Sequence, residues 1–597
     1  MSITRRDFLN GTALSIAAGM LPSSLLHAAD AARVGYPPAL TGLRGNHAGS
    51  YALAHSLGRE GVKYRAVTPR EVYDLVVVGG GISGLAAAWF YRRKFGADKR
   101  ILILENHDDF GGHARRNEFT VRGKRLVSYG GSAGIRASAL EQPAVAALFA
   151  GLGLDARTRL ADEGMYTQRG LGRAVFFNRE HFGRDQLLTG DPLLERATAA
   201  AFLAQAPLPA EDRTALQRLF DGSTDFLVGM PDGERATYLR RTSYAAFLRE
   251  RVKLGVAGLR FFRSRTNDAY ALDSEGVSVL DALAIGLPAG AGMPSGVNNP
   301  WLGKAPDTGL RFVDGNAGIA RLLVRDLIPG VAKAGAADSI AQAQFDYAQL
   351  DQEKAKVRLR LNSLVVGLEQ DRRLSRVTYG VDGALYAAET THVVLAGYNM
   401  MIPFIMPELP APQKAALRDA VKAPLIYTKV ALDNWRAFDA LKTRSIHAPT
   451  QRYTDLRLET PAGASPDDPV VLHMLYVPTV PDSGMTARER FRAGRAQLLA
   501  TPYEALERDV LGQLDRMLGP AGFASKKEVR AITVNRWSHG YACMPNSLYE
   551  DVEAARKKLQ AAAAPAGRVT IANSDAGGSP SVGAAIEQAA RAVEAFR

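Results

Sequence analysis

Apolar and polar positions along this chain form a pattern that predicts buried strands separated by helices. The clearest unit begins with the short β-branched run Asp74-Leu75-Val76-Val77-Val78, which is too short for a helix and suits a buried parallel strand. A glycine-rich turn follows, then an alanine-rich helix over 85–95 and a second strand over 101–104. We therefore predict a strand–turn–helix–strand unit near the start of the folded chain.

Strand-length apolar runs and stretches of helical spacing recur after this unit. We predict strands over 357–361, 364–368, 393–397, 426–432, 470–477 and 569–575, and helices over 195–205, 211–220, 235–254 and 581–596. Segments typical of a nucleotide-binding domain thus alternate along the chain with segments that lack its pattern. The predicted fold class is α/β, with a Rossmann-like nucleotide-binding domain interleaved with an α+β substrate-binding domain.

The first turn has the spacing G-x-G-x-x-G, with Gly79, Gly81 and Gly84 in the glycine positions and Ser83 between them. In such a turn the first glycine permits the tight bend, the second lets a pyrophosphate approach the backbone, and the third lets helix and strand pack closely. Glu105 follows Gly84 by 21 residues, where an acid binds ribose hydroxyls. The sequence therefore predicts a dinucleotide site; a glycine-rich turn that binds nothing is the alternative.

Two more glycine-dense turns follow the acid, one around Gly112 and His113 and one around Gly131 and Ser132. Such turns let the backbone approach a ligand closely, so we expect them beside the second phosphate and the ring system of the cofactor. Near the C-terminus a strand ends at Asp575, and a helix begins close to Ser581 and Val582. This arrangement offers a carboxylate for a hydroxyl group and free amides for a carbonyl oxygen.

The first 29 residues are predicted to be a targeting segment. Thr4-Arg5-Arg6-Asp7-Phe8-Leu9 matches the twin-arginine pattern, and the apolar stretch over 12–26 leads to small residues at 28–29. That stretch contains glycine, serine and proline and is too short to span a membrane as a stable helix. We therefore predict a periplasmic protein exported by the twin-arginine machinery; an ordinary amphipathic N-terminus is the alternative.

A chain of 597 residues is longer than one hydrophobic core usually organises. We predict a signal peptide over 1–29, an N-terminal arm over 30–72, nucleotide-binding segments over 73–140, 331–400 and 531–597, a helical substrate segment over 141–330 and a second substrate segment over 401–530. The net charge is +13, but no basic run is interleaved with aromatic residues, so we expect no nucleic-acid partner. The charge is compatible with peripheral attraction to anionic membranes. With Cys543 as the one cysteine, the chain forms no internal disulfide and no cysteine-based metal site.

The predicted arm is rich in glycine and histidine. Its residues His47 and His55 are candidate ligands of haem iron, because imidazole is the usual axial donor. A surface arm that wraps the nucleotide-binding domain with both histidines solvated is the alternative, and the residues by themselves favour it.

Over 73–135, 357–400 and 530–597 the chain resembles the flavin-containing amine oxidase family. The resemblance implies FAD in an interleaved two-domain fold, with hydride passing from an amine α-carbon to flavin N5. By position it implies FAD contacts at Gly79, Gly81, Ser83, Gly84, Glu105, Gly112, His113, Gly131, Ser132, Val365, Asp575, Ser581 and Val582. His113 stands where the family usually has arginine, so a phosphate contact there would be weaker and pH-dependent.

Shorter motifs over 40–45, 312–317 and 537–542, together with the leader, are similar to bacterial spermidine dehydrogenases. This similarity implies oxidation of a polyamine and hydrolysis of the imine to an aldehyde and an amine. It also implies haem b beside FAD, bound through His47 or His55. Electrons would pass to the haem, a quinone or another redox carrier.

A polyamine requires carboxylates or aromatic faces around its distal ammonium groups. We predict Glu141, Asp268 and Tyr270 as substrate residues, because they lie in segments expected to cover the flavin, with Asp273 and Asp281 as further candidates. Each of these acids is alternatively a surface carboxylate on a helix.

Three further residues are predicted to form the catalytic wall. Tyr427 and Lys429 share one face of a predicted strand. The family places a lysine near here that holds a water at flavin N5, and Lys429 matches it approximately. Tyr541, close to His539, would line the pocket. A lysine turned to solvent and a tyrosine confined to the core are the alternatives.

Two other functions compete with polyamine oxidation. One is an FAD oxidoreductase acting on an amino acid or on an apolar, carotenoid-like substrate, which an arginine clamp or an apolar tunnel would distinguish. The other is a non-catalytic binding protein stabilised by FAD, which no amine would reduce. The net charge of +13 opposes long-range attraction of a polycation, so a polyamine enzyme needs local acids.

Overall fold

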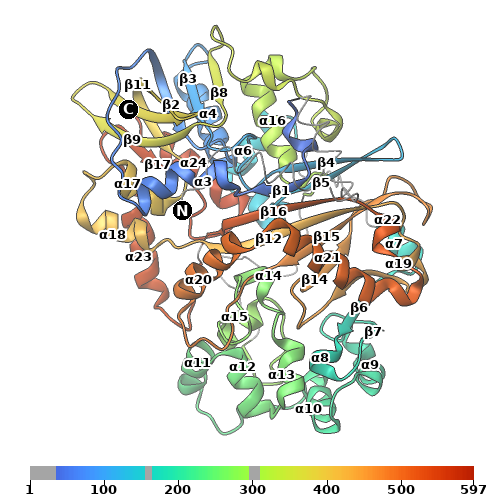
Figure 1. The fold of residues 1–597 in the computed structure, drawn as a ribbon. Coiled ribbons are helices and arrows are strands. Elements are labelled where there is room, and N and C mark those ends of the chain that lie inside the picture. Colours follow the sequence, from blue (N-terminus) through green and yellow to red (C-terminus); the bar gives the residue numbers. More distant parts are fainter. Residues whose placement is uncertain (1–34, 155–163, 295–309, 543) are drawn as a thin grey trace.

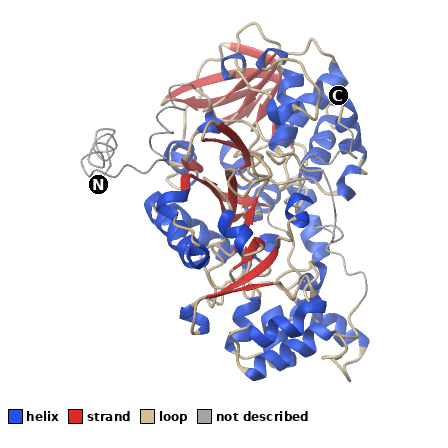
Figure 2. Cartoon of the chain, turned by 90° about the vertical axis from the view of Figure 1, so that its right-hand side faces the viewer, coloured by secondary structure: helices blue, strands red, loops and turns tan. Residues whose placement is uncertain are grey.

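The computed structural model describes residues 35–154, 164–294, 310–542 and 544–597, with the backbone alone at Ala48 and Tyr541. Two large sheets and their helices lie one above the other (Figure 1). Figure 2, turned by 90°, shows the first sheet at the top, strands of the second in the middle and a bundle of helices at the bottom. The predicted signal peptide over 1–29 lies outside the described residues.

The upper sheet contains the predicted nucleotide-binding unit. Its strand order is β8 (Val357–Arg360), β3 (Ile101–Leu104), β2 (Glu71–Val78), β11 (Ala384–Leu395), β10 (Ser375–Val381) and β9 (Leu364–Gln370), and β17 (Val569–Ile571) pairs with β11. Strands β8, β3, β2, β11 and β17 run parallel where they pair, whereas β9 and β10 add antiparallel pairs. The N-terminal and C-terminal cofactor segments therefore meet in one sheet.

Helices α4 (Ile82–Phe95) and α24 (Val582–Glu594) pack side by side over this sheet. Leu75 and Val77 of β2, Leu85 of α4 and Ile586 of α24 belong to one buried cluster. Helices α6 (Pro143–Gly151) and α16 (Ala317–Leu327) join them, packing against α24 and α4 respectively. Both lie in the segment 141–330 that we assigned to the substrate domain, so this range contains parts that cover the nucleotide-binding sheet.

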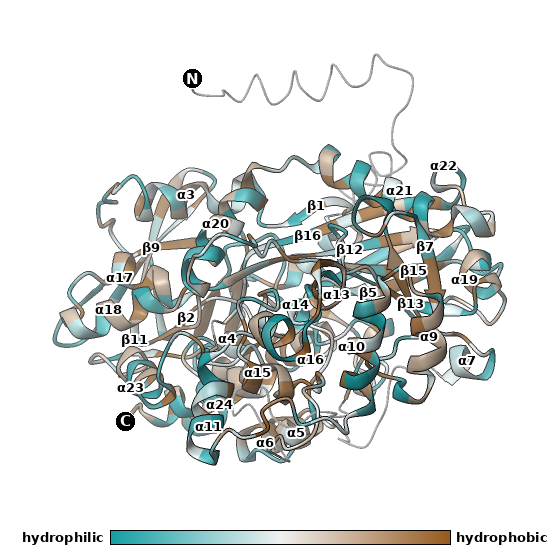
Figure 3. Ribbon diagram, turned by 90° about the horizontal axis from the view of Figure 1, so that it is seen from below, coloured by the Kyte–Doolittle hydropathy of each residue, from teal (hydrophilic) through white to brown (hydrophobic). Residues whose placement is uncertain are grey.

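The lower sheet has eight strands. Their order is β1 (Gly42–Gly45), β16 (Val529–Tyr541), β12 (Ala423–Leu432), β15 (Val470–Tyr476), β14 (Asp455–Leu458), β13 (Thr443–His447), β6 (Gly172–Phe177) and β7 (Gln186–Thr189). Figure 3 shows β15 coloured as hydrophobic along most of its length, in agreement with its burial. Helix α21 (Tyr503–Leu518) packs on this sheet through a shared apolar cluster that includes Leu514 and Val534.

The helices at the bottom of the molecule form a separate apolar cluster around Phe177, Phe202 and Phe261. One continuous helix was predicted over 235–254, but the structure divides it into α11 (Asp232–Arg241), α12 (Tyr244–Phe247) and a π-helical turn over 248–252. The break lies at Ser243, whose side chain accepts a hydrogen bond from the Ala246 amide and caps α12. The spacing of apolar residues did not reveal this break, because the helices on both sides of it bury apolar side chains.

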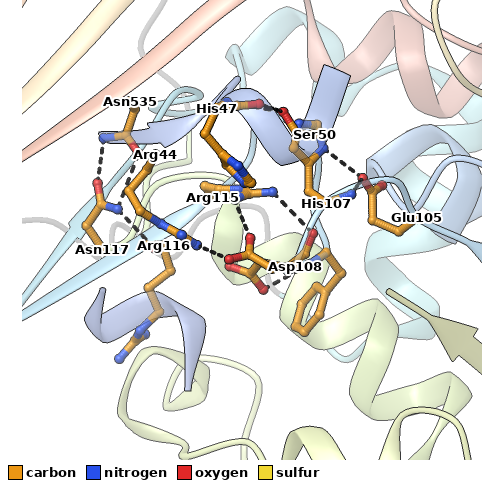
Figure 4. Close-up of polar contacts among 12 residues, drawn as sticks. Arg44, His47, Ser50, Glu105, His107, Asp108, Arg115, Arg116, Asn117 and Asn535 are labelled. Atoms are coloured by element: carbon orange, nitrogen blue, oxygen red, sulfur yellow. Dashed lines mark hydrogen bonds and ion pairs between the residues drawn. The ribbon is translucent and has the colours of Figure 1, made fainter. Parts of the chain in front are cut away.

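The N-terminal arm is part of both layers. Strand β1 pairs in parallel with β16, with Gly42 opposite Thr533, and α3 (Ala48–Gly58) follows it. Arg44 of β1 reaches across to Asp108, with Nη2 and Oδ2 2.8 Å apart (Figure 4). The arm is therefore an edge strand of the lower sheet fastened to the nucleotide-binding unit. Along the described ranges, no helix has both the length and the apolar character needed to cross a bilayer.

Candidate functional site

A cavity of about 620 Å³ lies where the two sheets meet. Its walls include the turn after β2, the C-terminal loop with Asp575, and residues of β12 and β16 in the lower sheet. The ends of parallel strands in an α/β sheet are the usual position of a ligand site. The cavity is within the ordinary size range of a cofactor or substrate pocket.

The first turn has the geometry that a bound pyrophosphate requires. Gly79 has φ +113°, a conformation that side chains rarely adopt, and a Cβ at Gly79 would lie 3.1 Å from the Ala396 carbonyl. No side chain caps α4 at Gly81, so the first amides of this helix face the cavity without a side-chain acceptor. Ser83 also lines the cavity and donates to the Ala572 carbonyl at 2.5 Å, which fastens α4 to the strand end 489 residues later.

Gly84 does not line the cavity and acts through packing. A Cβ at this position would lie 1.9 Å from the Gly79 carbonyl oxygen and 3.0 Å from Val77 Cγ1. Gly84 therefore allows the helix to approach β2 closely, as the spacing predicted. The remaining predicted cofactor residues line the cavity: Gly79, Gly81, Ser83, Glu105, Gly112, His113, Gly131, Ser132, Val365, Asp575, Ser581 and Val582.

Glu105 is a buried carboxylate at the cavity wall. It accepts hydrogen bonds from the Gly80 amide at 2.8 Å and from both the amide and Nδ1 of His107 at 2.9 Å. Burial by itself raises the pKa of Glu105, but the bonds and charge of His107 outweigh it, so the net pKa lies below its ordinary value. His107 Nε2 is buried at the same wall without a hydrogen-bond partner in the protein, as expected for a group that meets a ligand.

His113 begins a stack of rings on the cavity wall. The rings of His113 and Tyr398 are stacked 6.2 Å apart, and those of Tyr398 and His539 are stacked 4.9 Å apart. Burial, and then the charge of Lys422, lower the pKa of His113 to about 3, so the imidazole is neutral. Its Nε2 has no protein partner. The weaker, pH-dependent phosphate contact expected of His113 stays a prediction; in the structure its imidazole is neutral near pH 7.

The C-terminal acid Asp575 forms a buried ion pair. Lys422 Nζ lies 2.5 Å from Asp575 Oδ1, and the side chains are 3% and 2% exposed. The Asn399 amide donates to the other carboxylate oxygen at 3.2 Å. At the start of α24, Ser581 accepts from the Ala584 amide and caps the helix. Lys422 immediately precedes β12, so this pair joins the two sheets at the cavity.

Sequence reasoning missed Lys422 and several other residues that line the cavity. Tyr51 comes from α3, and Arg492 and Arg495 come from α20 (Ala487–Ala500); none of them belongs to a recognisable motif. His55 of α3 also lines the cavity, but it had been predicted only as a haem ligand. A lysine before a strand and two arginines on a helix are ordinary surface patterns, so nothing in their sequence neighbourhood distinguishes them.

Of the two predicted haem ligands, His55 lines the cavity and His47 does not. His47 caps the start of α3 and lies beside Arg115 and Asp108 (Figure 4). Burial lowers the pKa of His47 to about 4 against the attraction of Asp108. Within the described residues, no three His, Cys, Asp or Glu side chains are grouped as metal ligands.

The predicted catalytic lysine lies away from the cavity. Lys429 is fully buried in the lower sheet, with Nζ 2.5 Å from Glu459 Oε1 and 3.3 Å from the centre of the Tyr129 ring. Tyr427 packs edge-on against Tyr129 and His473 in the same layer. Neither Lys429 nor Tyr427 lines the cavity. Both share the face of β12 that carries the cavity residue Leu425, but they lie farther along the strand, where Tyr129 covers them. Lys422 does line the cavity. The side chain of Tyr541 lies outside the described part of the structure.

The free energy of unfolding is expected to depend on pH through His473, which is buried beside Lys429. Burial, and then Lys429, hold the pKa of His473 well below its ordinary value, so it stays neutral in the folded protein. The unfolded chain takes up this proton below about pH 6.5, so stability is lost as the pH falls below 6.5. We expect the free energy of unfolding to fall by about 2 kcal/mol between pH 7.5 and 5.0 through His473. Urea denaturation of wild type and His473→Gln at both pH values measures this difference; equal slopes in the two proteins would refute it.

The predicted substrate acids do not reach the cavity. Glu141 follows α5 (Ala137–Leu140) and is exposed, and Asp268 is exposed on the short α14 (Asn267–Tyr270). The sequence placed both in segments near the flavin but did not determine the direction of their side chains. Asp273 is buried and paired with Arg490, and Asp281 accepts a hydrogen bond from Ser547 at 2.9 Å.

Tyr270 lines a second cavity of about 150 Å³. Phe491, Tyr549 and Glu550 also line it, and Glu550 is paired with Arg488 at 3.2 Å. Residues that are adjacent in the sequence line the two cavities. Lys422 and Arg492 line the larger cavity, whereas their neighbours Ala423 and Phe491 line the smaller one.

Comparisons with known proteins agree with this architecture. A family model described as an NAD(P)-binding Rossmann-like domain matches residues 77–152. Coproporphyrinogen III oxidases of Mycobacterium tuberculosis (strain ATCC 25618 / H37Rv) and Mycobacterium bovis are 29% identical over 243 residues, which is 38% of this chain. The match spans 47% of these curated relatives, so this chain covers about half of their length.

Solved structures share the fold over most of the chain. A putative protoporphyrinogen oxidase from Exiguobacterium sp. 255-15 is 16% identical with a TM-score of 0.53, and covers 88% of this chain and 99% of its own. Cyclohexylamine oxidase from Brevibacterium oxydans IH-35A is 17% identical with a TM-score of 0.50, over 88% and 98%. A wild-type putrescine oxidase bound to putrescine is 16% identical with a TM-score of 0.50, over 88% and 99%. The predicted α/β fold with a Rossmann-like nucleotide-binding domain is confirmed.

Proposed function

We propose that this protein is an FAD-dependent oxidoreductase that oxidises an amine. The observation that carries the proposal is one cavity whose wall includes the glycine turn and Glu105 at one part and Lys422, Trp537 and His539 at another. A dinucleotide bound at the turn would extend toward the lower sheet, where a substrate would meet its ring system.

The residues of the cavity match the parts of FAD. The free amides of α4 would hold the pyrophosphate, and Glu105 the adenosine ribose. Asp575 and the start of α24 would hold the ribityl chain and a flavin carbonyl. When bound, the flavin accepts hydride from the amine α-carbon; the protein supplies position and excludes water through Trp537, Leu425 and the ring of Tyr398.

A polyamine substrate is part of the proposal, and the second cavity supports it. Tyr270, Phe491 and Tyr549 offer ring faces there, and the Glu550 carboxylate offers a negative charge. Aromatic faces and a carboxylate are the groups that bind an alkylammonium. The neighbouring positions of the two cavities would let one end of an extended amine lie at the flavin and the other at Glu550.

Anaerobic spectroscopy tests this function. Spermidine is expected to bleach the flavin absorbance of the purified protein, followed by an aldehyde product. Glu550→Gln is expected to raise KM for spermidine about tenfold with little change in kcat, because the ammonium loses one charged partner. The exposed Glu504 provides the control variant Glu504→Gln, which should match wild type. A flavin that no amine reduces would refute the proposed function.

A second substrate class is favoured by one observation. Arg492 and Arg495 line the main cavity, where a carboxylate of an amino acid would meet a guanidinium. The same spectroscopy with L-amino acids in place of spermidine separates the two classes. A carotenoid-like substrate is less favoured by a wall that contains these charges.

Haem, the electron acceptor and the location complete the proposal. His55 is the proposed ligand of a haem b, since its imidazole lines the cavity, and electrons would leave through this haem to a quinone or another carrier. A Soret band in the purified protein that disappears in His55→Ala tests the haem.

Export by the twin-arginine pathway is also proposed, and it rests on residues 4–9. Recovery of a processed chain from the periplasm tests this export.

A further inference from the structure

Three arginines line the cavity without forming an ion pair within the described residues: Arg59, Arg492 and Arg495. Arg59 caps the C-terminal end of α3, and Arg492 and Arg495 lie one turn apart on α20, so they share one face of that helix. Arg495 Nη1 contacts Met400 Sδ at 3.5 Å, a weak acceptor. Within the described residues, none of the three guanidiniums forms an ion pair.

Arg495 is the unusual member, because it is buried. It is 6% exposed, and burial together with the charges of Arg492 and Arg59 lowers its pKa to about 10. Other buried arginines of this protein have oxygen acceptors. Arg116 is paired with Asp314 and Arg490 with Asp273, and Arg536 donates to the carbonyl groups of Asn46 and Leu498. A buried charge with only like charges near it opposes folding, so its presence calls for a ligand that neutralises it.

The acids of the cavity do not supply this neutralisation. Glu105 is held by Gly80 and His107, and Asp575 by Lys422. The dinucleotide turn lies on the upper sheet, whereas α20 packs on β12 and β16 of the lower sheet. Arg492 and Arg495 therefore belong to another wall of the cavity than the amides expected to hold the pyrophosphate.

We propose that Arg59, Arg492 and Arg495 form an oxyanion subsite that binds the carboxylate or phosphate group of a second ligand in the FAD cavity. Guanidinium groups bind such oxyanions through paired N–H donors, and their low hydration favours this role in a cavity. The subsite rests on the proposed dinucleotide cavity but not on the identity of the amine.

Calorimetric titration of the FAD-loaded protein at low salt tests the subsite with two probes, inorganic phosphate and succinate. We expect saturable binding of at least one probe, weakened about tenfold or more in Arg495→Gln. The exposed Arg508 on α21 provides the matched control, and Arg508→Gln should bind as wild type does. Preference for succinate would identify a carboxylate ligand, and preference for phosphate a phosphorylated one.

Stability and cofactor content complete the test. Without a probe, Arg495→Gln is expected to melt at a higher temperature than wild type, since like-charge repulsion is removed; added probe should raise the melting temperature of wild type more than that of the variant. Arg492→Gln, at an exposed position, repeats the binding test should Arg495→Gln fold poorly. Absence of binding in wild type, unchanged binding in both variants, or loss of FAD from Arg495→Gln would overturn the proposal. The calorimetric titration uses no amine, so its result is independent of amine oxidation. A protein that binds phosphate but whose flavin no amine reduces would refute the proposed function and leave the subsite intact.

Discussion

Replacement of Gly84 by alanine is expected to remove most of the bound FAD and to destabilise the protein severely. The added methyl group would lie 1.9 Å from the Gly79 carbonyl oxygen, a backbone atom that cannot move without opening the turn. Overpacking of flexible side chains costs about 1–3 kcal/mol, and a clash with backbone costs more. The ratio of flavin to protein absorbance and the melting temperature measure both effects.

Gly233 provides the matched control. It lies on α11, and a Cβ there would meet no atom within 4 Å. Gly233→Ala should therefore keep its FAD and gain about 0.5–1 kcal/mol, the ordinary advantage of alanine over glycine in a helix. Full FAD content and an unchanged melting temperature in Gly84→Ala would show that the helix does not need close contact with β2.

Local sequence rules predicted the nucleotide-binding unit because its chemistry is local. The strand at β2, the glycine turn and α4 follow one another within 25 residues, and Glu105 comes after them at a fixed distance. The same rules predicted β17 and α24 at the other end of the chain. The sequence also predicted that the N-terminal and C-terminal units meet, because each of them offers binding groups for a different part of the same cofactor.

The lower sheet shows where such rules stop. Gly42 of β1 pairs with Thr533 of β16, and Lys422 pairs with Asp575. Neither partner is visible in the sequence, because pairing over such separations depends on how the whole chain packs. Arg495 illustrates the same limit: its i, i+3 neighbour Arg492 is typical of a solvated helix face, yet α20 turns this face into the cavity.

The residues predicted for the substrate show a related limit. Glu141 and Asp268 were chosen because their segments were expected to cover the flavin, and Lys429 because the family places a lysine near this position. Ala269, beside Asp268, lines the second cavity, and Leu425, on the strand of Lys429, lines the first. No residue close to Glu141 in the sequence is among those that line either cavity. The direction of each side chain depends on register within a short helix or strand, where a shift of one residue exchanges the faces. Tyr270 faces a cavity, whereas Lys429 is buried against Glu459 and the Tyr129 ring.

Substitution of Lys422 by methionine is expected to destabilise the protein by about 3–5 kcal/mol, because the Asp575 carboxylate is then buried without its partner. Both side chains are almost completely buried, and their charged atoms lie 2.5 Å apart. Urea denaturation of the FAD-loaded protein measures the loss. Lys557, exposed on α23 (Val552–Ala562), provides the control, and Lys557→Met should stay within about 0.5 kcal/mol of wild type.

The double variant Lys422→Met, Asp575→Asn separates the ion pair from the packing of either side chain. Asp575→Asn alone leaves the lysine ammonium buried and unpaired, so it too should be strongly destabilising. Removal of both charges eliminates this penalty, and the double variant is expected to be more stable than either single one. Single losses that simply add would mean that the two groups act independently. The FAD content of the double variant then reports the separate role of the carboxylate toward the ribityl chain, since asparagine retains an acceptor for the Asn399 amide but carries no charge.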